Sequence, residues 1–520
     1  MKNERGIFVG MMRKKRVAWV AACVGAALLT ISIARWTQHP ATASAATVNY
    51  PREVARVTFA AAGDVIPHQA VVQAAAAQAK VLMQEAKDGK DVKEVQEVKD
   101  TKDAANATPT AGNTATAAAT EKEAKEVKEA KEGKEGKESG TTASTKVENP
   151  HAGWDSLLAG VAEVFKQADF GFVNLETPVA PVKSRGTRAF MFNAPVALVE
   201  SLKANGVKIV SFANNHVFDQ GHVGFSESLE HLKEQGMLFA GAGGSAEDAW
   251  KPVILEKNGI KVGWLGMTRW LNGNRNPEKA GEPHVAFFPY AGLSMGAPGR
   301  DEAGVLEAVK KARETCDLLV ISIHWGTEYA TAPSAQDVET AHKMAEAGAS
   351  VILGHHPHVL QTVETYETED ERNTVIFYSL GNFLSNQARN YVSGVTPDRT
   401  GEQRDSLMVE FSVVKKDYGP AGMRFELADV GIIPVWTENN NLQVRRGKAK
   451  TPFIGPIFMD KEIARLQARE DELDQIGEKL TPEQKREFIQ VSNRLTMFKH
   501  RRELLVGRTG DDFVIAPPGM

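Results

Sequence analysis

The strongest constraint on the fold is a set of five strand-like segments, each followed almost at once by polar side chains. The apolar segments cover residues 57–62, 170–174, 207–212, 318–323 and 351–353. The polar residues that follow them are, in chain order, Asp64, Glu176, Asn214, Asn215, His216, His324, His355, His356 and His358. Open α/β sheets bind ligands at the carboxyl ends of their strands. The pattern therefore predicts that these side chains meet in one site.

The rhythm of the surrounding sequence predicts an α/β fold, because strands alternate with helical patterns. Helical patterns cover residues 153–167, 195–204, 223–234, 304–314 and 335–347, and a further strand covers 262–267. Strand-like runs at 374–378, 407–414 and 425–433 follow without intervening helices. They predict a second, more antiparallel sheet. Two packed sheets flanked by helices would satisfy both patterns.

The residue types at the predicted site are those of a metal centre. In an extended backbone, His356 and His358 project to the same side, so both can reach one ion. Carboxylate and imidazole together suit zinc, manganese or iron, and not calcium alone. Cys23 and Cys316 are the only cysteines, which excludes a cysteine-rich zinc site and a disulfide framework. Histidines outside the strand-end pattern are predicted to be structural, namely His68, His222, His231, His284 and His342.

The N-terminus predicts a membrane segment. The basic residues 13–16 precede an uncharged apolar run at 17–34. This order is typical of a signal anchor with its N-terminus in the cytoplasm. A cleaved signal peptide is the alternative, since residues 41–45 offer small-residue cleavage patterns. We favour the anchor in residues 1–36, followed by a linker at 37–54. The expected location is the inner (cytoplasmic) membrane, as a single-pass protein with a periplasmic domain; the alternative is secretion after cleavage.

The rest of the chain divides by composition. A folded domain is predicted at 55–78 and 150–436, interrupted at 79–149 by a Lys/Glu/Ala-rich insertion that is expected to be disordered or transiently helical. A charged extension at 437–520 has the periodicity of two amphipathic helices. The net charge of −4 gives no drive toward nucleic acid, so no nucleic-acid partner is expected.

Six motifs taken in order closely resemble the CapA/PgsA family of capsule and poly-γ-glutamate synthesis proteins. The resemblance covers residues 57–383 without the insertion. The motifs are Gly63-Asp64, Asn174-Leu175-Glu176, Asn214-Asn215-His216, His324-Trp325-Gly326, Gly354-His355-His356-Pro357-His358 and the segment 378–383, which contains Asn382. The family is similar in turn to calcineurin-like metallophosphatases. The resemblance thus implies a metallophosphatase-like four-layer α/β/β/α sandwich.

The resemblance also implies roles for single residues. Asp64 and His358 correspond to ligands of a first divalent metal, Glu176 to the bridging carboxylate and Asn215 to an amide ligand. His324 and His356 correspond to ligands of a second metal, and His216 to the acid/base that protonates the leaving group when a metal-activated water attacks. Supporting or substrate-facing positions are Asn214, Asp219, Glu328, His355 and Asn382.

Two departures from the metallophosphatase pattern bear on the chemistry. Ile66 stands where the first motif usually carries a histidine, and Glu176 is one methylene longer than the usual aspartate. Both changes are expected to weaken a two-metal centre or make it asymmetric. They leave open whether one or two ions of manganese, zinc or iron bind, and they put phosphomonoesterase activity in doubt.

The sequence is compatible with three functions. The first is a metal-dependent hydrolase or transferase acting on a phosphoester or on an anionic cell-envelope polymer such as poly-γ-glutamate. The alternative is a non-enzymatic membrane component of a polymer synthesis or export complex with membrane partners. A binding module for envelope glycans would rest on Trp270 and Trp325, which are predicted to belong to the core or the wall of the cleft.

Overall fold

The computed structural model describes residues 49–104, 149–183, 190–279, 281–290 and 299–520, with side chains of 89–104 left aside. Contacts divide the chain at residue 50, and the fold below is that of the second unit, residues 50–520. The predicted anchor at 1–36, the linker as far as residue 48 and most of the insertion lie outside the described residues. Within the described ranges, no helix is both long enough and apolar enough to cross a membrane.

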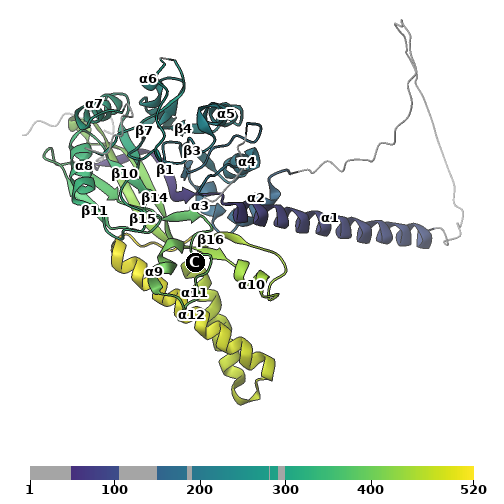
Figure 1. The fold of residues 1–520 in the computed structure, drawn as a ribbon. Helices are drawn as coiled ribbons and strands as arrows, with labels where there is room; N and C mark the ends of the chain where they lie inside the picture. The colour runs from purple at the N-terminus through teal and green to yellow at the C-terminus, as the bar shows by residue number, and fades with distance from the viewer. Residues whose placement is uncertain (1–48, 105–148, 184–189, 280, 291–298) are drawn as a thin grey trace, which may run out of the picture. The chain divides into compact units, whose positions relative to one another are not determined.

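The second unit contains two large sheets of mixed direction (Figure 1). The first has the order β16-β15-β14-β1-β2-β3-β4, with β13 paired to β1. Its strands are β1 (Arg52–Val65), β2 (Phe170–Leu175), β3 (Val207–Ser211), β4 (Leu238–Ala240), β13 (Asn382–Leu384), β14 (Asp405–Asp417), β15 (Met423–Asn439) and β16 (Ile454–Phe458). The second has the order β11-β12-β10-β9-β7-β6. Its strands are β6 (Val253–Lys257), β7 (Ile260–Thr268), β9 (Leu318–His324), β10 (Val351–His355), β11 (Val363–Glu367) and β12 (Asn373–Phe377), and β5 (Ala242–Gly243) pairs with β8 (His284–Val285).

Helices cover the outer face of each sheet. The helices α1 (Gln69–Ala104), α2 (Ala152–Leu158), α3 (Ala162–Gln167), α4 (Val196–Ala204) and α5 (Gly221–Glu234) contribute to the core on the first sheet. The helices α7 (Glu302–Arg313) and α8 (Ala335–Glu346) pack on the second sheet. In Figure 1, α4 and α5 lie beside β3 and β4, and α7 and α8 lie across the sheets from them. Two short helices, α6 (Ala246–Ala249) and α9 (Asp398–Gly401), lie in connections.

Alternating side chains along the strands build the layers. In β1, Phe59 and Ala61 point into the core between the sheets, whereas Ala60 and Ala62 point to the helices. In β9, Val320 faces the inter-sheet core, and its neighbours belong to the core under α7 and α8. This is the two-residue period of a strand buried on both faces. The layers therefore run helices, sheet, sheet, helices, and the predicted α/β class is confirmed.

The C-terminal extension packs onto this body through α11 (Met459–Ile476) and α12 (Pro482–Thr509), the two amphipathic helices that the periodicity predicts. Apolar side chains of both helices, including Leu466 and Phe498, join the core between the sheets. Arg501 of α12 is fully buried and forms an ion pair with the buried Asp405 at the start of β14. A third helix, α10 (Asn441–Arg445), precedes β16.

Several expectations need correction. The runs at 407–414 and 425–433 do not form a separate sheet: β14 pairs with β1 and β15 with β14 in the first sheet, while β12 lies parallel to β10 in the second. The expected helix at 153–167 is broken into α2 and α3. Helix α1 continues to Ala104, so residues 79–104 are helical where disorder was one expectation. Its first turns bury Val71 and Ala74, whose contacts hold the start of the helix.

Candidate metal centre

The site lies where the carboxyl ends of parallel strands from both sheets come together. In the first sheet Asp64 is in register with Asn174, and in the second His324 is in register with His355. Gly63 allows the tight approach that this edge needs, because a Cβ atom there would lie 1.9 Å from the carbonyl oxygen of Gly381. The amide of Asp64 donates to that same carbonyl at 3.0 Å.

Asp64 is completely buried and is held by donors on both carboxylate oxygens. Its Oδ1 accepts a hydrogen bond from Asn174 Nδ2 at 2.8 Å and lies 3.1 Å from His355 Nδ1. Its Oδ2 lies 3.2 Å from His358 Nδ1. Burial opposes the charged form, but the interactions with His355 and His358 prevail and hold the pKa of Asp64 well below its ordinary value. Asp64 is therefore an anion with a fixed orientation.

Glu176 is also completely buried, yet neither of its carboxylate oxygens has a hydrogen-bond partner among the described residues. Three imidazoles surround its Oε1 instead. His324 Nε2 lies at 3.7 Å, His358 Nε2 at 3.8 Å and His216 Nε2 at 3.9 Å. Burial and the charge of Asp64 raise the pKa of Glu176 well above its ordinary value. A buried carboxylate without donors is costly, so this geometry fits a cation-binding site.

The amide of Asn215 and the imidazoles of His324 and His356 form the second half of the cluster. His324 Nε2 lies 3.0 Å from Asn215 Oδ1 and 3.1 Å from His356 Nδ1. Burial lowers the pKa of His324 well below its ordinary value and that of His356 to about 3. Both rings are thus neutral at physiological pH, which is the form that binds metals.

His216 is placed by its neighbours at one side of Glu176. Its Nδ1 lies 2.8 Å from Asp219 Oδ2, and its backbone amide donates to Asn214 Oδ1 at 3.1 Å. Asn214 in turn donates to the carbonyl of Leu175 at 2.8 Å, which ties the His216 loop to the end of β2. Because Nδ1 is engaged by Asp219, Nε2 is the nitrogen directed toward the cluster. This is the arrangement expected of an oriented acid/base.

The two histidines of the His-Pro-His segment meet as predicted, but the physical reason differs. His356 and His358 have positive φ angles of 97° and 59°, so the segment after β10 is a turn and not an extended strand. The ring centroids lie 6.0 Å apart, and both imidazoles reach Glu176. Left-handed backbone at non-glycine residues is strained and tends to occur at functional sites.

The predicted supporting residues fall into two groups. His355 and Asn382 are buried: His355 contacts Asp64, and Asn382 Oδ1 lies 3.1 Å from His358 Nδ1. His355 thus lies against Asp64, a predicted ligand, and its role as a supporting residue stays a prediction. Glu328 is exposed, and its charge contributes to the raised pKa of Glu176. The structure brings the acidic ligand positions, the amide and the histidines of the prediction together, with Glu328 at the outside.

One further residue of the site was not predicted as such, and one predicted structural histidine lies near it. Asn174 is buried between Asp64 and His324, with Nδ2 3.4 Å from His324 Nδ1. The sequence signal for Asn174 was its position at the end of a strand, within the motif Asn174-Leu175-Glu176. His68, predicted to be structural, is close enough for the charges of His358 and His216 to lower its pKa, although burial contributes most to the value of about 4. Its Nδ1 accepts from the amide of Asn386 at 3.2 Å.

The two tryptophans of the predicted core or cleft wall have separate places. Trp325 is buried and donates from its indole nitrogen to the carbonyl of Tyr378 at 3.0 Å. Trp270 is half-buried, and its ring centroid lies 6.0 Å from that of His356. Trp325 is thus a core residue, and Trp270 forms part of the wall beside the cluster.

Two overlapping groups of side chains in the described residues have the spacing needed to hold a metal ion. One contains Glu176, His356 and His358, and the other contains Asp64, Glu176 and His324, with the ligand atoms of each group within 4.8 Å of one another. Glu176 belongs to both, as a bridging carboxylate would. The orphaned oxygens of Glu176 and the neutral imidazoles fit a divalent cation with nitrogen and oxygen ligands. The distances place His356 in one group with His358, whereas the family resemblance assigns these two histidines to different ions. The assignment of each ligand to a particular ion therefore stays a prediction.

Comparisons with known proteins agree with the motifs. The family described as "Bacterial capsule synthesis protein PGA_cap" matches residues 58–387. The chain is 32% identical to the PGA biosynthesis protein CapA of Bacillus subtilis over 54% of its own length and 66% of that protein. It is 30% identical to the capsule biosynthesis protein CapA of Bacillus anthracis over 45% of its own length and 55% of that protein. A probable polyglutamine synthesis accessory protein of Mycobacterium tuberculosis is 27% identical over 44% of this chain and 59% of its own length. The chain thus spans less than two thirds of each of these relatives.

Proposed function

The chain belongs to the PGA_cap family of bacterial capsule synthesis proteins, and on this premise we propose that it is a metal-dependent hydrolase acting in the synthesis of an anionic cell-envelope polymer. The proposed substrate is an amide of a γ-linked glutamate polymer or a phosphoester. The proposed biological setting is supported by the names of the relatives, which refer to capsule or PGA biosynthesis. A metallophosphatase-like centre of one or two manganese, zinc or iron ions is part of the proposal.

The observation that carries the proposal is the state of Glu176. Its carboxylate is buried without a hydrogen-bond donor, while three imidazole nitrogens lie 3.7–3.9 Å from one of its oxygens. These separations are too long for hydrogen bonds. They are close to those between ligands that share one ion at about 2.0–2.2 Å from each ligand atom. A purely structural cluster would satisfy the carboxylate directly.

The residues divide the work of a hydrolysis in a consistent way. Asp64, Glu176, Asn215, His324, His356 and His358 would hold the metal. When bound, a divalent ion supplies positive charge that acidifies water and polarises the group under attack. His216, oriented by Asp219, stands where it can give a proton to the leaving atom.

We further propose that the site works at the outer face of the cytoplasmic membrane. The support is the basic and apolar pattern of residues 13–34, which is typical of a signal anchor. Membrane partners of a polymer synthesis or export complex fit the same setting. A fusion of residues 1–48 to a reporter that works only outside the cytoplasm tests this: activity supports the proposal, and its absence contradicts it.

A second candidate is a non-enzymatic role in the same setting, in which the cluster holds polymer or stabilises an assembly. The observation in its favour is the description of one relative as a synthesis accessory protein. Ile66 and Glu176 also depart from the metallophosphatase pattern. This candidate predicts that metal-site variants still support polymer production, whereas removal of residues 1–36 abolishes it.

The deciding experiment assays the full chain on phosphoesters and on γ-linked oligoglutamate, before and after chelation, with His216→Ala and His356→Ala as variants. We expect hydrolysis that chelation removes and that a divalent metal restores, with both variants inactive. His222→Ala is the matched control, because His222 is exposed and binds the backbone carbonyl of Arg275. Full activity in both site variants would exclude the catalytic proposal.

A further inference from the structure

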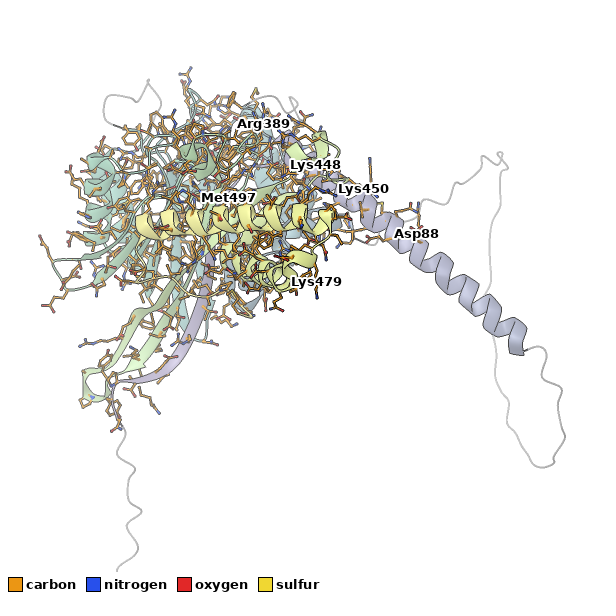
Figure 2. The ribbon with its side chains drawn as sticks, turned by 90° about the horizontal axis from the view of Figure 1, so that it is seen from below. Asp88, Arg389, Lys448, Lys450, Lys479 and Met497 are labelled. Atoms are coloured by element: carbon orange, nitrogen blue, oxygen red, sulfur yellow. The ribbon has the colours of Figure 1, made fainter. Side chains whose placement is uncertain are left out.

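A cavity lies among the C-terminal elements, apart from the proposed metal ligands. It has a volume of about 520 Å³ and is lined by residues of the 391–404 connection, the end of β15, α10 and the following loop, and α12. Figure 2 views the molecule from the side on which α12 lies, and it labels Met497 of α12 and Lys448 of the loop, which both line this cavity. The proposed hydrolysis assigns these residues no part.

The wall of the cavity contains a buried arginine that lacks an acidic hydrogen-bond partner. Arg404 is 6% exposed, and its Nε atom has no hydrogen-bond partner in the described part of the chain. One terminal nitrogen donates to the carbonyl of Ala388 at 3.0 Å, and the guanidinium carbon lies 5.5 Å from the ring centroid of Trp436. The buried hydroxyl of Tyr391 has Ser393 as a polar neighbour but makes no hydrogen bond of normal geometry there. Donors buried in this way point to an acceptor supplied by a ligand.

The charges around the cavity are predominantly positive. Arg494 is satisfied by Glu438 at 3.1 Å and by Glu462 at 2.9 Å. Arg446 and Lys448, by contrast, are exposed and form no ion pair with the described residues. Glu438 is the acid that lines the cavity, and Arg494 already neutralises it. Arg404, Arg446 and Lys448 therefore leave an uncompensated positive field that favours an anion.

The cavity is linked to the metal centre through one side chain. Asn382 Oδ1 lies 3.1 Å from His358 Nδ1, and Asn382 Nδ2 donates at 2.9 Å to the carbonyl of Gln403, the residue before Arg404. On the other wall, Thr437 donates to the carbonyl of Asn382 at 3.1 Å. Thr437 stands between Trp436 and Glu438, which both line the cavity. A polymer of several units that enters the metal site is thus close to this cavity.

We propose that the cavity is a subsite that binds the carboxylate side groups of a γ-linked glutamate polymer at a distance from the bond that is cleaved. This inference rests on the polymer substrate of the proposed function. Arginine pairs with carboxylates through two parallel hydrogen bonds. The amide side chains of Gln490 and Asn493, which also line the cavity, suit the amides that link the units of such a polymer.

The test compares two pairs of substitutions that remove the same charge from the same segment. Arg446→Ala with Lys448→Ala alters the cavity wall, whereas Arg445→Ala with Lys450→Ala alters exposed neighbours that do not line it. Binding of fluorescent γ-linked oligoglutamate to the full chain is measured by anisotropy, with free glutamate and polyphosphate as competitors. We expect the first pair to weaken binding about tenfold or more and the second less than about twofold. Polyphosphate competition that equals competition by unlabelled polymer would contradict carboxylate recognition.

A third variant, Tyr391→Phe, removes only the buried hydroxyl and is expected to weaken binding about threefold without altering the thermal midpoint. Equal weakening by both pairs, or none by the cavity pair, would overturn the subsite. The result is separable from the proposed hydrolysis. A chain that binds polymer at the cavity but neither binds metal nor hydrolyses would reject the hydrolase and keep the subsite. A chain that hydrolyses phosphoesters but does not bind the polymer would reject the subsite and keep the hydrolase.

Discussion

Glu176 Oε1 lies 3.7 Å from His324 Nε2, and no hydrogen bond reaches the Glu176 carboxylate from the described residues. A buried carboxyl group and a buried neutral imidazole thus face each other across a gap whose width suits a cation. Glu176 belongs to both candidate ligand groups. The properties of this one side chain therefore give the sharpest predictions.

Glu176→Gln should have opposite effects on metal binding and on the metal-free protein. Loss of the anionic ligand is expected to weaken metal affinity by more than the roughly 10–100-fold typical of outer partners. In chelator at pH 8, the same change should stabilise the chain by about 1–2 kcal/mol, since the wild-type chain must either keep Glu176 protonated far above its unfolded pKa or bury its charge without donors. Chemical unfolding with and without metal measures both. Glu230→Gln, at an exposed acid on α5 outside the site, is the control and should change neither.

Metal binding should release a proton and strengthen as the pH rises. The pKa of Glu176 is raised well above its ordinary value by burial and by Asp64, so the metal-free form holds a proton that the metal displaces. His324 and His356 have lowered pKa values and are already neutral, so they release none near pH 7. Calorimetry in two buffers of different ionisation enthalpy measures the release. A binding constant independent of pH would contradict this origin.

The same pKa shift sets the pH dependence of folding without metal. An acid whose folded pKa exceeds its unfolded value near 4.5 adds stability at low pH, and this contribution is lost as the pH rises through the folded pKa. The stability difference between wild type and Glu176→Gln in chelator should therefore widen with rising pH. A stability difference that narrows as the pH rises would show that another titrating group dominates the pH dependence of folding.

Asp219→Asn should impair catalysis and spare the metal. Asp219 contacts His216 Nδ1 at 2.8 Å and also accepts from the amide of Phe192. Loss of the carboxylate should disorder the His216 ring and lower the hydrolysis rate about 10–100-fold with unchanged metal content. Glu230→Gln, an exposed acid on α5, is the control. Loss of metal in Asp219→Asn would instead identify Asp219 as part of the ligand shell.

Arg501→Met should destabilise the whole body. Arg501 and Asp405 are both buried and pair α12 with the first sheet, so removal of the cation leaves an uncompensated buried carboxylate. The expected cost is about 3–5 kcal/mol in the free energy of unfolding. Lys499→Met on the exposed side of α12 should change it by less than about 0.5 kcal/mol. Equal effects would mean that the ion pair is not the contact that holds α12.

Local patterns predicted the elements of the fold well but not how distant strands pair. The two-residue and helical periods located strands such as β9 and β10 and helices such as α8 within a few residues. They did not show that β14 pairs with β1, because that pairing joins segments about 350 residues apart and depends on the whole core. The break between α2 and α3 was also missed.

The site was predictable because its residues share one position, the end of a strand. That rule brought Asp64, Glu176, His324 and His356 together without any knowledge of which strands are neighbours. It could not give the left-handed backbone at His356 and His358, which depends on the turn after β10. His68 follows β1 by three residues, and its position near the site depends on tertiary packing.

The most direct test of the metal centre is the metal content of the purified full chain, measured by inductively coupled plasma mass spectrometry after gel filtration. We predict at least one manganese, zinc or iron ion for each chain, with the ion lost in a His324→Ala, His356→Ala double variant and retained in His222→Ala. A wild-type chain with no more metal than the double variant, even after incubation with each of the three ions, would contradict a metal centre at this site.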